Sequence, residues 1–112
     1  MRKILLSAFA AASIMIQAQN PFFQEFNTAP HGAAPFDKIT FADYEPAIDR
    51  GIRLGLEAVD AIVNNPEAPT FENTIVALEH ADTDLNRVLM VFDPLLSALS
   101  DDNMMELSMK IT

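Results

Sequence analysis

Two stretches of the chain repeat apolar residues at the spacing of an amphipathic helix. In the first stretch the apolar positions recur at intervals of 4, 4, 3 and 4 residues, and they are Ile48, Ile52, Leu56, Val59 and Val63. In the second the intervals are 4, 3, 4, 3, 4 and 3, with one polar member, at Phe71, Ile75, Leu78, Asp82, Leu85, Leu89 and Phe92. A stripe of this kind is the side that a helix buries. The pattern predicts two long antiparallel helices that pack through these stripes.

Polar residues and prolines predict the bounds of the first helix. Thr40 and Asp43 have the spacing of a capping box, which marks a helix start. Because a proline inside a helix removes a hydrogen bond, Pro46 predicts a separate first turn near residues 41–44 and a main helix that begins near Pro46. Asn64-Asn65-Pro66 predicts its end, since the residue before a proline avoids the helical region.

Similar signals bound the second helix and a third one. Thr70 is the expected N-cap of the second helix, and Glu72 lies where it favours the helix dipole. Pro94 predicts a kink or an end near Phe92. Residues 100–103 (Ser-Asp-Asp-Asn) form a break and a cap, after which Met104, Leu107 and Ile111 begin another stripe. This last stripe reaches Thr112 without a stop signal, so we expect the helix to continue in a longer polypeptide.

Residues 19–39 combine helix-breaking residues with large aromatic ones. Pro21, Pro30, Pro35 and Gly32 exclude a continuous helix. The stretch nevertheless holds four phenylalanines, at Phe22, Phe23, Phe26 and Phe36. A free linker is more polar than this. We therefore expect an extended strap that docks its rings onto the helices, at about 1.5–3 kcal/mol per buried ring. A peptide-binding tail with aromatic anchors is the alternative.

Residues 1–18 have the pattern of a secretory signal peptide. Arg2 and Lys3 provide a positive start, and the uncharged, apolar run over residues 4–16 suits a signal sequence but is too short to span a bilayer. Cleavage is expected between Ala18 and Gln19. The sequence thus predicts export, to the periplasm or the medium; a buried N-terminal helix is the alternative.

Charge and cysteine content limit the partners of the exported part. The formal net charge is −9, and it becomes −11 once Arg2 and Lys3 are removed with the signal peptide. A chain this acidic repels phosphate groups, so neither nucleic acid nor an anionic membrane is an expected partner. Because there are no cysteines, disulfides cannot stabilise the exported chain, and we expect a larger domain to supply the core.

Several polar clusters have some of the residues that a metal site requires. Glu79, His80 and Asp84 come close together on a helix, but a zinc site needs at least three converging ligands, and a solvated acidic helix face is the preferred interpretation. Residues 82–86 (Asp-x-Asp-x-Asn) imitate the start of a calcium loop. Arg87 occupies the position of its required glycine and Asp93 that of its final glutamate, so we reject this site.

Other residues suited to chemistry also lack the partners that chemistry requires. Asp82 and Asp102 have no second carboxylate at a spacing that would form an acid–base pair. Four methionines, interpreted as core filling rather than a binding surface, are Met90, Met104, Met105 and Met109. No zinc-peptidase, phosphate-loop or nucleophile-elbow motif is present. We therefore predict no catalytic, cofactor-binding or metal-binding residue within this chain.

Four segments, considered together, resemble a known family of enzymes. They are residues 20–22, 33–39, 44–51 and 65–79, and the most specific is Pro-Thr-Phe-Glu-Asn-Thr-Ile at residues 69–75. Their order and spacing are similar to the N-terminal region of bacterial peptidyl-dipeptidases (dipeptidyl carboxypeptidases), which are zinc metallopeptidases related to oligopeptidase A and thimet oligopeptidase. The resemblance covers about residues 20–107, and none of the matched motifs is catalytic.

The resemblance implies a fold and a function for a longer parent protein. The parent would be an all-α peptidase of two lobes that removes dipeptides from the C-termini of short peptides, with zinc held by a His-Glu-x-x-His helix that this chain does not contain. Residues 40–112 would be the truncated helical part of its N-terminal lobe, following the signal peptide (1–18) and the strap (19–39). The alternative is an exported helical binding or adaptor module without enzymatic activity.

Overall fold

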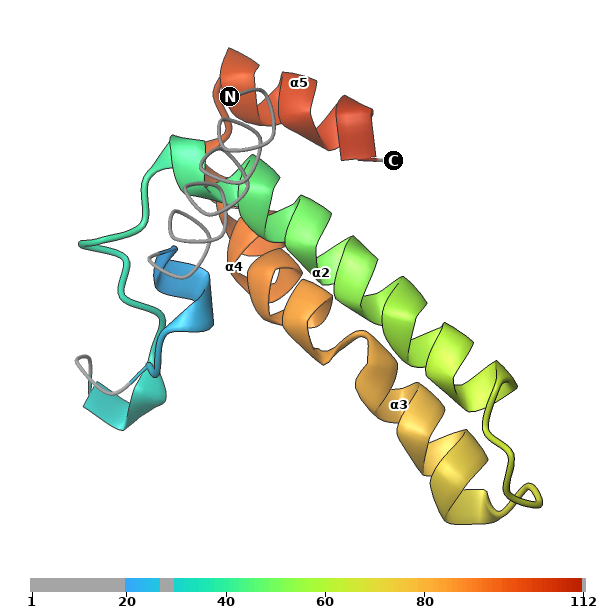
Figure 1. The fold of residues 1–112 in the computed structure, drawn as a ribbon. Helices are drawn as coiled ribbons and strands as arrows, with labels where there is room; N and C mark the ends of the chain where they lie inside the picture. Colours follow the sequence, from blue (N-terminus) through green and yellow to red (C-terminus); the bar gives the residue numbers. More distant parts are fainter. Residues whose placement is uncertain (1–19, 27–29, 112) are drawn as a thin grey trace, which may run out of the picture.

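A computed structural model describes residues 20–26 and 30–111 of the chain (Figure 1). Two short 3-10 turns come first, η1 (Pro21–Phe23) and η2 (Pro30–Gly32). They are followed by α2 (Phe41–Val63), the π-helical turn η3 (Phe71–Val76), α3 (Ala77–Ala81), α4 (Thr83–Leu99) and α5 (Asp102–Ile111). Over the described residues the fold has no strand, which confirms the predicted all-α class. The expected signal peptide lies outside them, and no helix within them is long and apolar enough to cross a membrane.

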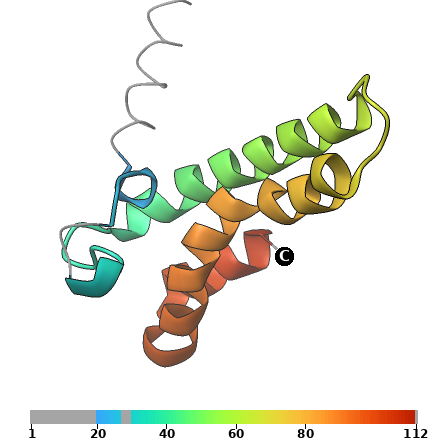
Figure 2. The ribbon, with the colours of Figure 1, turned by 90° about the horizontal axis from the view of Figure 1, so that it is seen from below.

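The helices form a hairpin with a folded base. α2 runs antiparallel to η3 and α3, and residues 64–70 connect them at the tip of the hairpin (Figure 1). At the end of α3 the chain bends away, so that α4 leaves the axis of α3 and α5 folds back near the start of α2 (Figure 2). The N-terminal strap lies against the same end of α2. η1, α2, α4 and α5 therefore meet at the base.

The first helix differs from its prediction at Pro46. α2 is one uninterrupted helix from Phe41, with Pro46 inside it. Its start is capped as predicted, because the Asp43 carboxylate accepts hydrogen bonds from the Thr40 backbone N–H (2.7 Å) and from the Thr40 hydroxyl (2.8 Å). The first turn is also held by the burial of Tyr44 and Ala47 on either side of the proline. One missing backbone donor so near the N-terminus is not enough to break the helix.

The second predicted helix is divided into η3, α3 and α4, and Asp82 and Pro94 act differently from the prediction. Thr70 does cap it, since its hydroxyl accepts from the Asn73 N–H at 3.0 Å. The helix then breaks at Asp82, where φ is −96° and ψ is 12°. Pro94 neither ends nor interrupts α4, which continues to Leu99. Pro94 is exposed, and the buried Val91 and Phe92 just before it hold that part of α4 in place.

The predicted packing stripe of α2 is wrong beyond Ile48. The side of α2 that meets α3 and α4 carries small residues, Gly51 and Gly55. A Cβ atom on Gly51 would lie 2.7 Å from the Leu85 Cα, and one on Gly55 would lie 2.9 Å from the Asp82 Oδ1. At Gly51 the helices thus approach too closely for a larger side chain, whereas at Gly55 the neighbouring atom is the end of a side chain. The exposed Asp82 side chain thus lies beside Gly55, at the break between α3 and α4.

The buried residues form one cluster at the base, which we call the proximal cluster. Its members are Phe22, Tyr44, Ala47, Ile48, Val88, Val91, Phe92 and Leu107. Tyr44 is at its centre, with its ring centroid 5.2 Å from that of Phe22 and 5.2 Å from that of Phe92. Tilted and edge-on aromatic pairs of this kind add to the free energy of burial. The cluster joins the strap, α2, α4 and α5 into one unit.

The strap contributes to this cluster through its first residues. Asn20 is buried, accepts a hydrogen bond from the Phe22 N–H (3.0 Å) and donates one to the Asp43 carbonyl (2.8 Å). Phe23 and Phe26 are partly buried, each beneath a guanidinium, that of Arg50 (4.0 Å from the ring centroid) and that of Arg87 (4.4 Å) respectively. Phe36, predicted to dock as well, is 58% exposed. Three of the four phenylalanines therefore lie on the helices.

Candidate functional site

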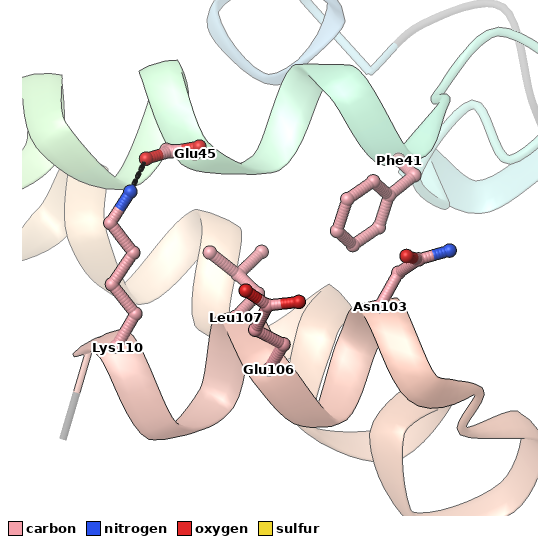
Figure 3. Close-up of a pocket in the computed structure, with 6 residues that line it drawn as sticks. All are labelled: Phe41, Glu45, Asn103, Glu106, Leu107 and Lys110. Carbon is pink, nitrogen blue, oxygen red and sulfur yellow. Dashed lines mark hydrogen bonds and ion pairs between the residues drawn. The ribbon is translucent and has the colours of Figure 1, made fainter.

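A small pocket lies between the start of α2 and α5 (Figure 3). Its volume is about 210 Å³, and its lining residues are Phe41, Glu45, Asn103, Glu106, Leu107 and Lys110. α5 places the last four on one side because they recur every three or four residues along it. α5 itself starts at a predicted cap, where the Asp101 side chain accepts from the Met104 N–H at 2.9 Å.

One ion pair dominates the electrostatics of this pocket. The Lys110 ammonium donates to the Glu45 carboxylate and thereby links α5 to α2. This hydrogen bond and the charge of Glu45 raise the pKa of Lys110, and Asp49 and Glu106 act in the same direction. Both partners are half exposed or more. The pair therefore fixes the orientation of α5 rather than contributing much stability.

The residues that line the pocket do not form a catalytic arrangement. It is smaller than the roughly 300–1,000 Å³ of typical ligand sites. Its only cation is already paired with Glu45, and Glu106 and Asn103 are both exposed. A nucleophile with an adjacent base, or two carboxylates in different environments, would be needed for hydrolysis. The lining contains neither arrangement, so the pocket is a gap where α5 leaves α2.

The residues of the two candidate metal clusters lie along α3 and α4. His80 is exposed in the last turn of α3, and its carbonyl accepts from the Thr83 hydroxyl at 2.8 Å. Asp84 lies in the first turn of α4, beyond the break at Asp82. Residues 83–86 form the first turn of α4. Among residues 20–26 and 30–111, no three His, Cys, Asp or Glu side chains lie close enough to hold a metal ion.

The methionines are less buried than predicted. Met104 packs against the proximal cluster, but Met90 is 79% exposed, and Met105 and Met109 are also exposed. Core filling therefore applies to one of the four. The error arises because α4 and α5 each bury only one narrow side in this chain.

The most distinctive surface is one that the sequence predicted to be buried. Seven large apolar side chains on α2, η3 and α3 are exposed, and we call them the hairpin face: Ile52, Leu56, Val59, Val63, Phe71, Ile75 and Leu78. The exposed fraction is 64% at Leu56 and 66% at Phe71. Apolar patches of this kind on a soluble protein mark sites of interaction. The hairpin face is therefore the candidate binding surface among the described residues.

The sequence is similar to that of known proteins over most of its length. The chain is 39% identical over 88 residues to the dipeptidyl carboxypeptidase of Salmonella typhimurium, and 39% identical over 88 residues to that of Escherichia coli. Each match covers 79% of this chain and 13% of the relative, so the chain spans about an eighth of the length of these curated relatives. No protein-family model and no solved structure matches the chain. The resemblance to bacterial peptidyl-dipeptidases is confirmed.

Proposed function

We propose that this chain is the N-terminal part of an exported zinc metallopeptidase that releases dipeptides from the C-termini of oligopeptides. The observation that carries the proposal is the 39% identity to two dipeptidyl carboxypeptidases across 79% of the chain. The peptide substrates, the zinc ion and the catalytic residues belong to the longer parent. The contribution of this chain is structural, as part of the helical wall beside the substrate channel.

The side chains of the described residues are consistent with a structural contribution of this chain to the parent enzyme. A zinc site does not fit the described residues, because no three potential ligands converge among them. We therefore assign no catalytic step to any residue of this chain. The signal-peptide pattern of residues 1–18 supports export, with cleavage between Ala18 and Gln19, and the net negative charge supports short peptides rather than nucleic acid as the ligands of the parent.

The gene and its product test the proposal together. We expect the reading frame to continue past Thr112 and to encode a His-Glu-x-x-His motif, the two-histidine zinc site of such peptidases. The purified long product should contain zinc and release dipeptides from a blocked oligopeptide, whereas the 112-residue chain should do neither. A long product that contains zinc but leaves peptides intact would contradict the assigned activity.

The exposed hairpin face favours one second candidate. An exported helical binding module without activity would use an apolar surface of this kind to hold a partner. A stop codon directly after Thr112, together with export of the short chain, would support this alternative. Both outcomes are read from the DNA and from the mass of the exported protein.

A further inference from the structure

The hairpin face is large for a surface that remains in water. Leu56, Val63 and Phe71 are each more than 60% exposed, and the other four members are between 37% and 53% exposed. They come from two helical segments that lie side by side (Figure 1). Few monomeric proteins leave so many large apolar side chains together in solvent.

Helix geometry places the seven side chains on the same side of the hairpin. The inward positions of α2 are Gly51, Gly55, Ala58 and Ile62, and those of η3 and α3 include Thr74, Ala77 and Ala81. Most members of the face follow an inward position by one residue and are rotated from it by about 100°. Because the two segments are antiparallel, this rotation turns both stripes toward the same side. The hairpin therefore carries its two apolar stripes on the same side.

Acidic residues border this face on both edges. On α2, Asp49 and Asp60 each come one residue after a member of the apolar stripe. On η3 and α3, Glu72 and Glu79 do the same, and all four are exposed. The nearest cation on α2, Arg53, is paired with Glu57 at 2.8 Å. No lysine occurs between residues 39 and 109. A second copy of this chain would bring acidic edges against acidic edges, which opposes self-association through this face.

The matched region includes the hairpin. Only 24 of the 112 residues lie outside the 88-residue match, so a continuous match contains residues 25–88 wherever it begins. The relatives retain this part within proteins of which it forms about an eighth. The remaining length provides segments that are able to cover an apolar face.

From these observations, and resting on the proposed function, we propose that the hairpin face is the docking surface for another segment of the same longer polypeptide. The occupant is a helix that is apolar along one side and carries Lys or Arg along the edges of that side. Its apolar side chains cover Leu56, Phe71 and their neighbours. Its cations face Asp60 and Glu79 across the two edges.

Thiol labelling tests whether the face is covered, because the chain has no cysteine of its own. Leu56→Cys places a thiol on the face, and Glu57→Cys is the matched control, one residue away on the charged side of α2. Each variant is made in the 112-residue chain and in the long product of the gene, and labelling by N-ethylmaleimide is followed at that peptide by mass spectrometry. Since burial protects a thiol, we expect Leu56→Cys to react at least about tenfold more slowly in the long product than in the short chain. Glu57→Cys should react at similar rates in both.

Two labelling results would overturn the inference. Equal rates for Leu56→Cys in the short chain and in a long product that cleaves peptides would show that the face stays open, with the proposed function intact. Slow labelling of Leu56→Cys in the short chain, with sedimentation as a dimer, would identify a second copy as the occupant. A stop codon after Thr112 leaves no further segment and contradicts both proposals before any labelling is done.

Charge reversal tests the chemistry of the occupant. Asp60→Lys with Glu79→Lys should restore fast labelling of Leu56→Cys in the long product, because the cations of the occupant would then meet cations. Asp93→Lys, an exposed acidic residue of α4 away from the face, is the control and should leave the labelling slow. Unchanged protection in the double variant would contradict a basic partner.

Discussion

The two ends of α2 bury their apolar residues to opposite extents. Near its start, Ile48 is 1% exposed and packs with Tyr44 and Phe92 in the proximal cluster. Two turns later, Leu56 is 64% exposed, and Val63 at the end of the helix is 75% exposed. At the base, four separate segments meet. At the tip, the described segments beside α2 are η3 and α3.

The difference shows that the partner, and not only the pattern, decides which apolar residues are buried. Along the hairpin the contact between helices is made mostly by glycine and alanine, which permit close approach but bury little apolar area. The larger side chains point to one side of this contact and remain exposed. The proximal cluster therefore stabilises the short chain, and the hairpin face is stabilising only when another segment covers it.

The largest expected effect is on the free energy of unfolding, and it distinguishes a phenylalanine of the proximal cluster from one of the hairpin face. Phe92→Ala, in the proximal cluster, should lower the free energy of unfolding of the 112-residue chain by about 3–5 kcal/mol, because it removes a fully buried ring. Phe71→Ala, on the hairpin face, should change it by less than about 0.5 kcal/mol. Urea unfolding followed by circular dichroism measures both. Equal losses would mean that the face is buried in the short chain.

The glycines of α2 provide the next sharpest comparison. Gly51→Ala should destabilise the chain by about 1–3 kcal/mol, since the new Cβ would meet the Leu85 backbone at 2.7 Å and the helices would have to separate. The new Cβ of Gly55→Ala would lie 2.9 Å from the end of the Asp82 side chain, which can move, and 3.6 Å from the Ala81 carbonyl oxygen, an ordinary van der Waals distance. The gain in helix propensity, about 1 kcal/mol, should then leave Gly55→Ala neutral or more stable. A stabilising Gly51→Ala would contradict the close approach.

Loss of the hydrogen bonds that attach the strap should lower the free energy of unfolding by an intermediate amount. Asn20→Ala removes the acceptor for the Phe22 N–H and the donor to the Asp43 carbonyl, and should cost about 1–2 kcal/mol. Asn103→Ala, an exposed residue of the α5 pocket, is the matched control and should have little effect. Chemical unfolding of the two variants gives the comparison. If both substitutions proved harmless, the strap would not be part of the base.

The smallest expected effect is a decline of stability in alkali. Burial, with a smaller contribution from Asp43, raises the pKa of Tyr44 above 10.0, and the Glu45 contacts raise the pKa of Lys110 above 10.5. A raised folded pKa means that the contribution is complete at lower pH and is lost as the pH rises through the folded value. The urea midpoint should therefore fall above pH 10. Tyr44→Phe should reduce this fall, and an unchanged decline would show that the phenol is not its source.

The features predicted well from the sequence are those fixed by a few neighbouring residues. The caps at Thr40 and Thr70, the end of α2 before Asn64, and the break before α5 depend on local hydrogen bonds that the sequence specifies. Pro46 and Pro94 lie inside uninterrupted helices, contrary to the prediction, because local rules cannot show how firmly buried neighbours hold a helix together. The domain boundaries of the predicted strap and signal peptide stay predictions.

The surfaces were harder to predict than the elements. The same spacing that correctly indicates helices near Ile48 and Phe92 also marks Leu56 and Leu78, and a period alone cannot say whether a partner is present. The π-helical turn at η3 and the break at Asp82 also rotate the second stripe, so its early and late members do not share one buried side. The close approach at Gly51 is visible only once the helices are placed together.

Hydrogen exchange on the 112-residue chain tests the central claim most directly. Amides at the base, at Ile48 and Phe92, should exchange only through global unfolding and so be the slowest. Those of the hairpin tip, at Val59 and Leu78, should exchange much faster through local opening, because little apolar area holds the tip closed. If the tip amides exchanged as slowly as those of Ile48 and Phe92, the hairpin would be stable without a partner, and the contrast between the two ends of α2 would be contradicted.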